Sequence, residues 1–172
     1  MKFSLKVVTT PMCEEIVKLA GISNYEVNKA PDSVGADIAV VLSETKLSTK
    51  SIKIKINTFS QIKESIEMLS DEFETSPLNY ELNETTGSKN QNRKIKVKVH
   101  SNFLKEIVKD MGFSVVDKDY NFVVYPDYMK EIVVNENVET VEIPSHKNVP
   151  LSAIKRAEMR YNILEKRLCM RP

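Results

Sequence analysis

The stretch VVTTPMCEEIVKLAG, from Val7 to Gly21, decides how the rest of the chain is interpreted. A β-branched run, two threonines, a proline and an apolar-periodic segment that ends at a glycine together predict a strand followed by a helix. Thr10 is suited to the N-cap, Pro11 to the first helical position and the glycine to the helix stop. The stretch therefore predicts a strand–helix unit with Cys13 in the first turn of the helix.

The same pattern returns as KVKVHSNFLKEIVKDMG, residues 96–112, where Ser101 takes the cap role and Gly112 the stop. Two further pairs of blocks follow in the same order: DIAVVLSETK with YNFVVYPDYMK, and SIKIKINT with ETVEIPS. Blocks that recur in the same order indicate an internal duplication.

Each half then has the pattern strand, helix, strand, strand, strand, helix, which predicts an α/β fold of two similar βαβββα halves. We expect an N-terminal half at 1–75, a linker or loop at 76–92 that is rich in Asn, Thr, Ser and Glu, and a C-terminal half at 93–172. SVVDKDYNFVVY predicts a hairpin that turns near Lys118 and Asp119, so we expect mixed sheets. The last helix, from about Leu151 to Cys169, carries an apolar stripe of Ile154, Ala157, Tyr161, Leu164 and Leu168.

Composition excludes several classes of protein. The chain has 172 residues, of which 41% are hydrophobic and 28% charged, as in an ordinary soluble globular protein. It contains no apolar run of membrane-span length and no signal peptide, so we expect a cytoplasmic location. Two cysteines make neither a disulfide framework nor a metal-ligand pattern, and four unclustered glycines exclude the usual phosphate-binding loops. The net charge of +1 does not indicate a nucleic-acid-binding protein, and no cofactor is identified.

Polar side chains follow the predicted strands, where open α/β sheets bind their ligands. We expect a small anionic metabolite or cofactor precursor there, with no metal. The candidate ligand-binding residues are Thr9, Thr10, Glu44, Ser101, Asp127 and His146. The chain's two histidines both lie at these ends, which makes His100 a candidate general base.

Two interpretations of Cys13 remain open. At a helix N-terminus the pKa of a thiol falls, so Cys13 could be the nucleophile or covalent acceptor in acyl or thioester chemistry. The repeat places Leu104 at the equivalent position, which favours a small apolar residue packed under the sheet. Whether the protein is an enzyme is therefore left open.

The string TTPMCEEIVKLAGI, residues 9–22, resembles two kinds of protein from methanogenic archaea. One is the thioester-forming family that handles the guanylylpyridinol cofactor of Fe-hydrogenase, in which an early cysteine after the first strand holds a carboxylate of the precursor. The other is the C-type accessory protein of methyl-coenzyme M reductase, which has a similar T-x-P-x-C-E string. The resemblance implies an archaeal protein of cofactor biosynthesis, and only Cys13 carries a role from it.

Two other functions compete with ligand binding. The chain could be a non-catalytic assembly or interaction subunit of a larger, methanogenesis-related complex, which meets a protein partner through a solvated basic face of Arg156, Arg160, Arg167 and Arg171 on the last helix. It could also be an RNA-binding module that uses the strand lysines of SIKIKIN, residues 51–57, and KIKVKV, residues 94–99. No aromatic residues alternate with these lysines, as a base-stacking surface would require, so nucleic acid is the less favoured partner.

Overall fold

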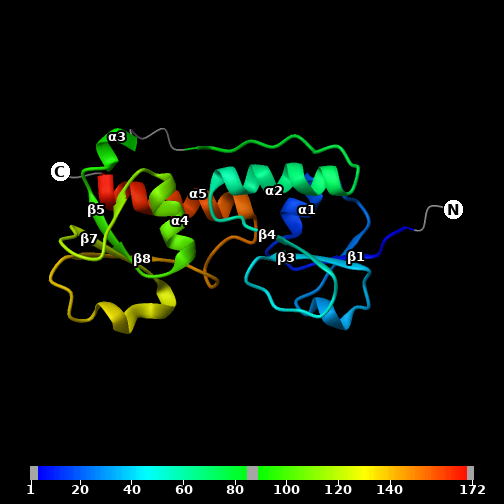
Figure 1. Ribbon diagram of the computed structural model, residues 1–172, viewed down its shortest axis with the longest axis horizontal. Coiled ribbons are helices and arrows are strands. Elements are labelled where there is room, and N and C mark those ends of the chain that lie inside the picture. The colour runs from blue at the N-terminus through cyan, green and yellow to red at the C-terminus, as the bar shows by residue number, and fades with distance from the viewer. Residues whose placement is uncertain (1–3, 85–88, 170–172) are drawn as a thin grey trace. The chain divides into compact units, whose positions relative to one another are not determined.

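The computed structural model describes residues 4–84 and 89–169, which form two compact units (Figure 1). The first unit comprises Met1–Leu82 with Leu151–Ile154, and the second comprises Asn83–Pro150 with Lys155–Pro172. No helix within the described ranges is both long enough and apolar enough to cross a membrane.

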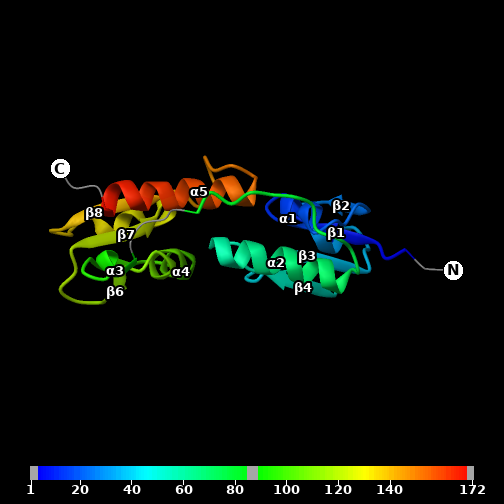
Figure 2. The ribbon, with the colours of Figure 1, turned by 90° about the horizontal axis from the view of Figure 1, so that it is seen from above.

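The first unit is a four-stranded parallel sheet of order β2-β1-β3-β4. Its elements are β1 (Val7–Thr9), α1 (Glu14–Leu19), β2 (Tyr25–Val27), the 3₁₀ helix η1 (Pro31–Ser33), β3 (Ile38–Leu42), β4 (Ser51–Ile54) and α2 (Phe59–Glu72). Helices α1 and α2 lie side by side on one face of the sheet and η1 lies on the other (Figures 1 and 2). The apolar run of β3 is buried at Ile38, Ala39, Val40 and Val41, as a central strand covered on both faces must be.

The second unit repeats this architecture with a parallel sheet of order β6-β5-β7-β8. Its elements are α3 (Lys89–Asn92), β5 (Lys96–Val99), α4 (Asn102–Asp110), β6 (Ser114–Val115), β7 (Phe122–Pro126), the 3₁₀ segment η2 (Asp127–Val133), β8 (Glu139–Ile143), α5 (Ala153–Leu164) and the π-helical turn η3 (Glu165–Cys169). Helices α4 and α5 cover one face and η2 covers the other (Figure 1). The α3 helix lies within the segment expected to be a linker.

The predicted α/β class with two similar halves is confirmed, and even small details repeat. Asp37, just before β3, accepts a hydrogen bond from the backbone N–H of Lys6 at 2.7 Å. Asn121, just before β7, accepts one from the N–H of Lys96 at 3.0 Å. Because β3 starts opposite Val7 and β7 starts opposite Val97, the strand register makes these two valines equivalent.

The expected hairpin, and with it the mixed sheet, is wrong. β6 and β7 do not pair with each other; both pair in parallel with β5, which lies between them. The connecting segment is held by β5 at both ends, because Val116 donates to the carbonyl of Val97 and Asn121 donates to that of Lys96. Asp119, with φ of 56°, does make a turn there, but between parallel strands.

The sequence predicts the caps and stops of the helices correctly except at the start of α1. Gly21 and Gly112 both follow helix ends with φ near +90°, Ser101 caps α4, and Thr58 forms a capping box with Gln61 at α2. Thr10, by contrast, is not the cap of α1. The N–H of Cys13 bonds to the carbonyl of Thr10 at 3.0 Å in a tight turn, so that Cys13 becomes the N-cap and the helix begins at Glu14.

The last helix packs through the expected stripe. Ala157, Tyr161, Leu164 and Leu168 are buried, whereas Ile154 at the start of the stripe is only partly buried.

Candidate functional site: a pocket at the ends of β7 and β8

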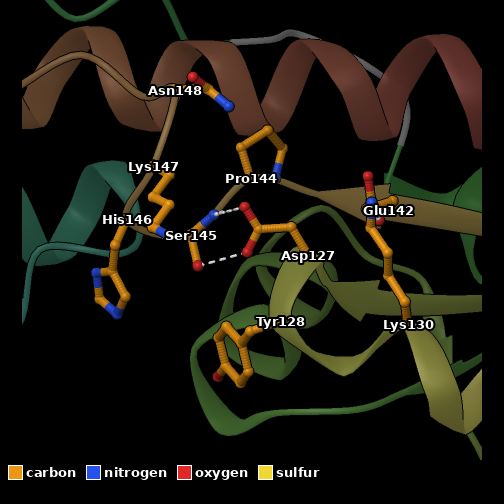
Figure 3. A pocket seen from close by; sticks show the side chains of 9 residues that line it. All are labelled: Asp127, Tyr128, Lys130, Glu142, Pro144, Ser145, His146, Lys147 and Asn148. Atoms are coloured by element: carbon orange, nitrogen blue, oxygen red, sulfur yellow. Dashed lines mark hydrogen bonds and ion pairs between the residues drawn. The ribbon is translucent and has the colours of Figure 1, made fainter.

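The second unit has an open pocket of about 680 Å³ where β7 and β8 end (Figure 3). The two strands are parallel neighbours, so the segments that follow them meet at one edge of the sheet. The pocket is lined by Asp127, Tyr128, Lys130, Glu142, Pro144, Ser145, His146, Lys147 and Asn148.

A carboxylate and a hydroxyl join the two segments at the floor of the pocket. The hydroxyl of Ser145 donates to Asp127 at 2.6 Å, and the backbone N–H of Ser145 donates to the other carboxylate oxygen at 3.3 Å. Burial acts to raise the pKa of Asp127, but the bonds from Ser145 and the nearby His146 outweigh it and hold the pKa below its usual value. Asp127 is therefore an ionised hydrogen-bond acceptor at neutral pH.

A buried positive charge lies directly behind this floor. Arg160 is only 5% exposed, and its guanidinium donates to the carbonyls of Pro144 at 3.1 Å and Ser145 at 2.6 Å. It also lies 4.9 Å from the centre of the Phe103 ring. Burial, with a contribution from Arg156, lowers the pKa of Arg160 to about 10, while Asp127 acts in the opposite direction. Arg160 is thus still charged at neutral pH.

The solvated basic face expected on the last helix is therefore wrong at two of its four positions. Arg156 is buried as well and donates to the carbonyl of Pro150 at 3.2 Å. Guanidinium groups with several donors satisfy backbone carbonyls of a loop that has no strand partner, which explains why they point inward. Arg167 is exposed and pairs with Glu139 at 3.3 Å, and Arg171 lies outside the described residues.

The side chains around the opening carry both signs of charge. Lys130 pairs with Glu142 at 3.4 Å, whereas His146, Lys147 and Asn148 are not buried. Two carboxylates and two lysines line the pocket, so their formal charges cancel. The charge of Arg160 behind the floor then makes the site net positive.

The structure brings two of the sequence candidates, Asp127 and His146, to this pocket. His100 and Ser101 follow β5 in the same unit but do not line it. In the described part of the chain, Nε2 of His100 is the buried side-chain polar atom without a hydrogen-bond partner. Burial is the largest of the effects that lower the pKa of His100, and the charges of Lys98 and Lys105 add to it against Glu136.

The remaining candidates belong to the first unit. The hydroxyl of Thr9 is buried and donates to the carbonyl of Val40 at 2.8 Å, which gives it a structural role in the sheet. Glu44 is not buried and accepts a bond from Ser43 at 3.0 Å, and Thr10 accepts the turn bond described above. Cys13 is 0% exposed. Such burial favours the packing interpretation of the thiol.

Sequence reasoning missed much of the pocket. Tyr128 and Ser145 directly adjoin predicted residues, but neither is among the candidates from the sequence. Arg160 carried a readable signal, since it lies three residues after Ala157 and four before Leu164 on the buried stripe of α5. Lys130 and Glu142 gave no comparable signal because their pairing depends on η2.

The chemistry of the described side chains does not indicate a metal centre. No group of three His, Cys, Asp or Glu residues in 4–84 and 89–169 lies together as a metal ion would require.

Comparisons with known proteins add information on the fold. No protein-family model matches the sequence, and no curated protein matches it. Among solved structures, the chain is similar to a manganese-bound point mutant of a periplasmic metal-binding protein from Candidatus Liberibacter asiaticus, with a TM-score of 0.51. The alignment covers 96% of this chain and 100% of the other at 9% identity. At that identity the similarity supports the two-unit α/β fold alone.

Proposed function

We propose that the second unit binds a small anionic metabolite or cofactor precursor in the pocket at the carboxyl ends of β7 and β8. One observation carries the proposal: the buried charge of Arg160 lies behind a floor whose lining charges otherwise cancel. A buried cation raises the local potential most where water is excluded, so an anion at the opening is favoured.

The accessible side chains of the loop after β8 supply the direct contacts. His146 and Lys147 follow Ser145 in sequence, and both side chains reach solvent. Both can therefore contact a phosphate or carboxylate directly. Glu142 does not compete for them, because it already pairs with Lys130. A volume of about 680 Å³ suits a small metabolite.

Binding is proposed here without chemistry on Cys13. Thioester formation needs an exposed thiolate, and Cys13 lies beneath the surface as the N-cap of a six-residue helix. The competing proposal, a protein partner that docks on the last helix, is weakened because Arg156 and Arg160 are buried and cannot contact a partner.

The proposal is tested by adding ribose 5-phosphate, with inorganic phosphate in parallel, to ¹⁵N-labelled protein and following backbone amide shifts. We expect the largest shifts at residues 145–148 and weaker binding as salt is added. Lys147→Gln and His146→Gln should each weaken binding about two- to fivefold, as for partly screened charge contacts.

Lys118→Gln is the matched control, because Lys118 is exposed in the same unit but does not line the pocket. Equal weakening by Lys118→Gln would show only general charge attraction. If neither ribose 5-phosphate nor inorganic phosphate shifts the amide signals of residues 145–148, the proposal is overturned.

A further inference from the structure

An aromatic ring at the pocket is not explained by anion binding alone. Tyr128 is 58% exposed and lines the pocket. It is the second residue of η2, and its neighbour Asp127 forms the floor. In Figure 3 the ring of Tyr128 lies below Asp127, and Ser145 lies between Asp127 and the side chains of His146 and Lys147.

Each of these groups selects a different part of a ligand. An exposed aromatic ring offers a face on which a planar heterocycle can stack. An ionised carboxylate accepts hydrogen bonds and repels anions, so Asp127 selects a part of the ligand that carries hydroxyl groups. Its oxygens accept bonds from the hydroxyl and the N–H of Ser145 and from the N–H of Tyr128, which is fewer than the roughly four bonds that a carboxylate can accept. Lys147 and His146 select the anion.

We infer that the ligand is a nucleoside phosphate, with its base on Tyr128, its ribose hydroxyls at Asp127 and its phosphate at Lys147 and His146. The inference rests on the proposed function and adds the class of ligand to it. A planar ring, a diol and an anion are the features of this class, and an aliphatic phosphate would leave the Tyr128 ring unused.

The experiment compares adenosine, guanosine, cytidine and uridine 5′-monophosphates with ribose 5-phosphate by isothermal titration calorimetry. At least one nucleotide should bind about tenfold more tightly than ribose 5-phosphate, the gain expected from one stacked base. Tyr128→Ala should remove this preference and leave the affinity for ribose 5-phosphate unchanged, whereas Tyr128→Phe should keep it.

Ile132→Ala is the control for disturbance of η2, because Ile132 is 50% exposed on the same segment and does not line the pocket. It should leave both affinities unchanged. The 2′-deoxy form of the tightest nucleotide should bind more weakly, and equal binding would overturn the contact between ribose and Asp127.

The two proposals fail in different ways. If ribose 5-phosphate binds as tightly as every nucleotide, or if Tyr128→Ala keeps the preference, the nucleoside assignment is overturned and the anion site stands. If neither ribose 5-phosphate nor any nucleotide binds, both are overturned.

Discussion

The two units share one strand order, yet they differ in their connections, and two connections that are longer in the second unit build the pocket. Between the third and fourth strands the first unit has residues 43–50, whereas the second has 127–138 with η2. Between the fourth strand and the last helix the first unit has 55–58, whereas the second has 144–152. The shared strands and helices supply the core, and the segments added in one copy supply the candidate site, as expected for loops on a common scaffold.

The units also differ in the first turn of the helix after the first strand. α4 begins right after its cap, Ser101, whereas α1 begins only after the turn through Cys13. Despite this difference, Cys13 and Leu104 are both 0% exposed. The same buried position is thus filled by residues of different chemistry.

The largest expected effect on stability comes from substitution of the glycines that end the equivalent helices α1 and α4. Gly21 has φ of 85°, and a Cβ there would overlap the carbonyl oxygen of Ser76. Gly112 has φ of 90°, and its Cβ would lie 2.8 Å from the carbonyl oxygen of Lys89. Both substitutions to alanine therefore add a steric clash to the cost of a left-handed backbone. We expect Gly21→Ala to lower the free energy of unfolding by about 3 kcal/mol and Gly112→Ala by about 2 kcal/mol.

Urea denaturation followed by far-ultraviolet circular dichroism measures both effects. Gly35→Ala is the control, because φ is 64° but nothing lies within 4 Å of its Cβ, so only the backbone cost of about 1 kcal/mol remains. If Gly21→Ala costs no more than Gly35→Ala, the close packing of the helix stop in the first unit is wrong.

The second prediction concerns the stability and thiol reactivity of Cys13 variants, which distinguish a packing role from a chemical one. Leu104→Ala should cost about 3 kcal/mol, and Cys13→Ala, which removes a smaller group, about 1 kcal/mol. In a Cys169→Ser background, iodoacetamide should label Cys13 slowly at about pH 7.5 in the native protein and rapidly in urea.

A contrary labelling result would revive the chemical interpretation. Rapid native labelling that a bound metabolite suppresses would show that the thiol is reactive and accessible. The exposed Cys169, labelled in a Cys13→Ala variant, provides the rate for an accessible thiol.

The sequence predicts the elements of the fold better than their pairing. Alternation, caps and stops are local, so the buried strand at 38–42, the Thr58 capping box and both glycine stops could be identified from neighbouring residues. The pairing of β6 with β5 is not local. The turn at Asp119 looks the same whether the strands on either side of it pair or are separated by a third strand.

The site was predictable only where strand ends mark it. Asp127 and His146 follow β7 and β8 closely, so the rule for open α/β sheets identifies them. Arg160 lies far along the chain, and its role depends on the carbonyls of a loop whose path the sequence does not specify. His100 follows β5 by the same rule, but its Nε2 lies buried rather than at the pocket.

The smallest expected effect is on the pH dependence of stability, and it concerns His100. The strand register makes His100 equivalent to Thr10 of the first unit, so the two units differ here in a titratable group. Burial and the charges of Lys98 and Lys105 hold the pKa of His100 below its usual value of 6.5. The folded state then binds fewer protons than the unfolded state. The stabilisation is fully present above pH 6.5 and is lost as pH falls from there through the lowered folded-state pKa.

His100→Thr, which copies the residue of the first unit, should flatten the pH dependence of stability in this window. The lowered pKa of Asp127 cannot produce the same loss, since its usual value of 3.8 confines its effect to more acidic conditions. Amide hydrogen exchange at about pH 7.0 and about pH 5.5, on either side of the unfolded-state pKa, assigns the loss to a unit. Protection should fall at β5 and β7, while β1 and β3 change less. An equal fall in both sheets, or no change on replacing His100, would mean that the imidazole of His100 does not control this transition.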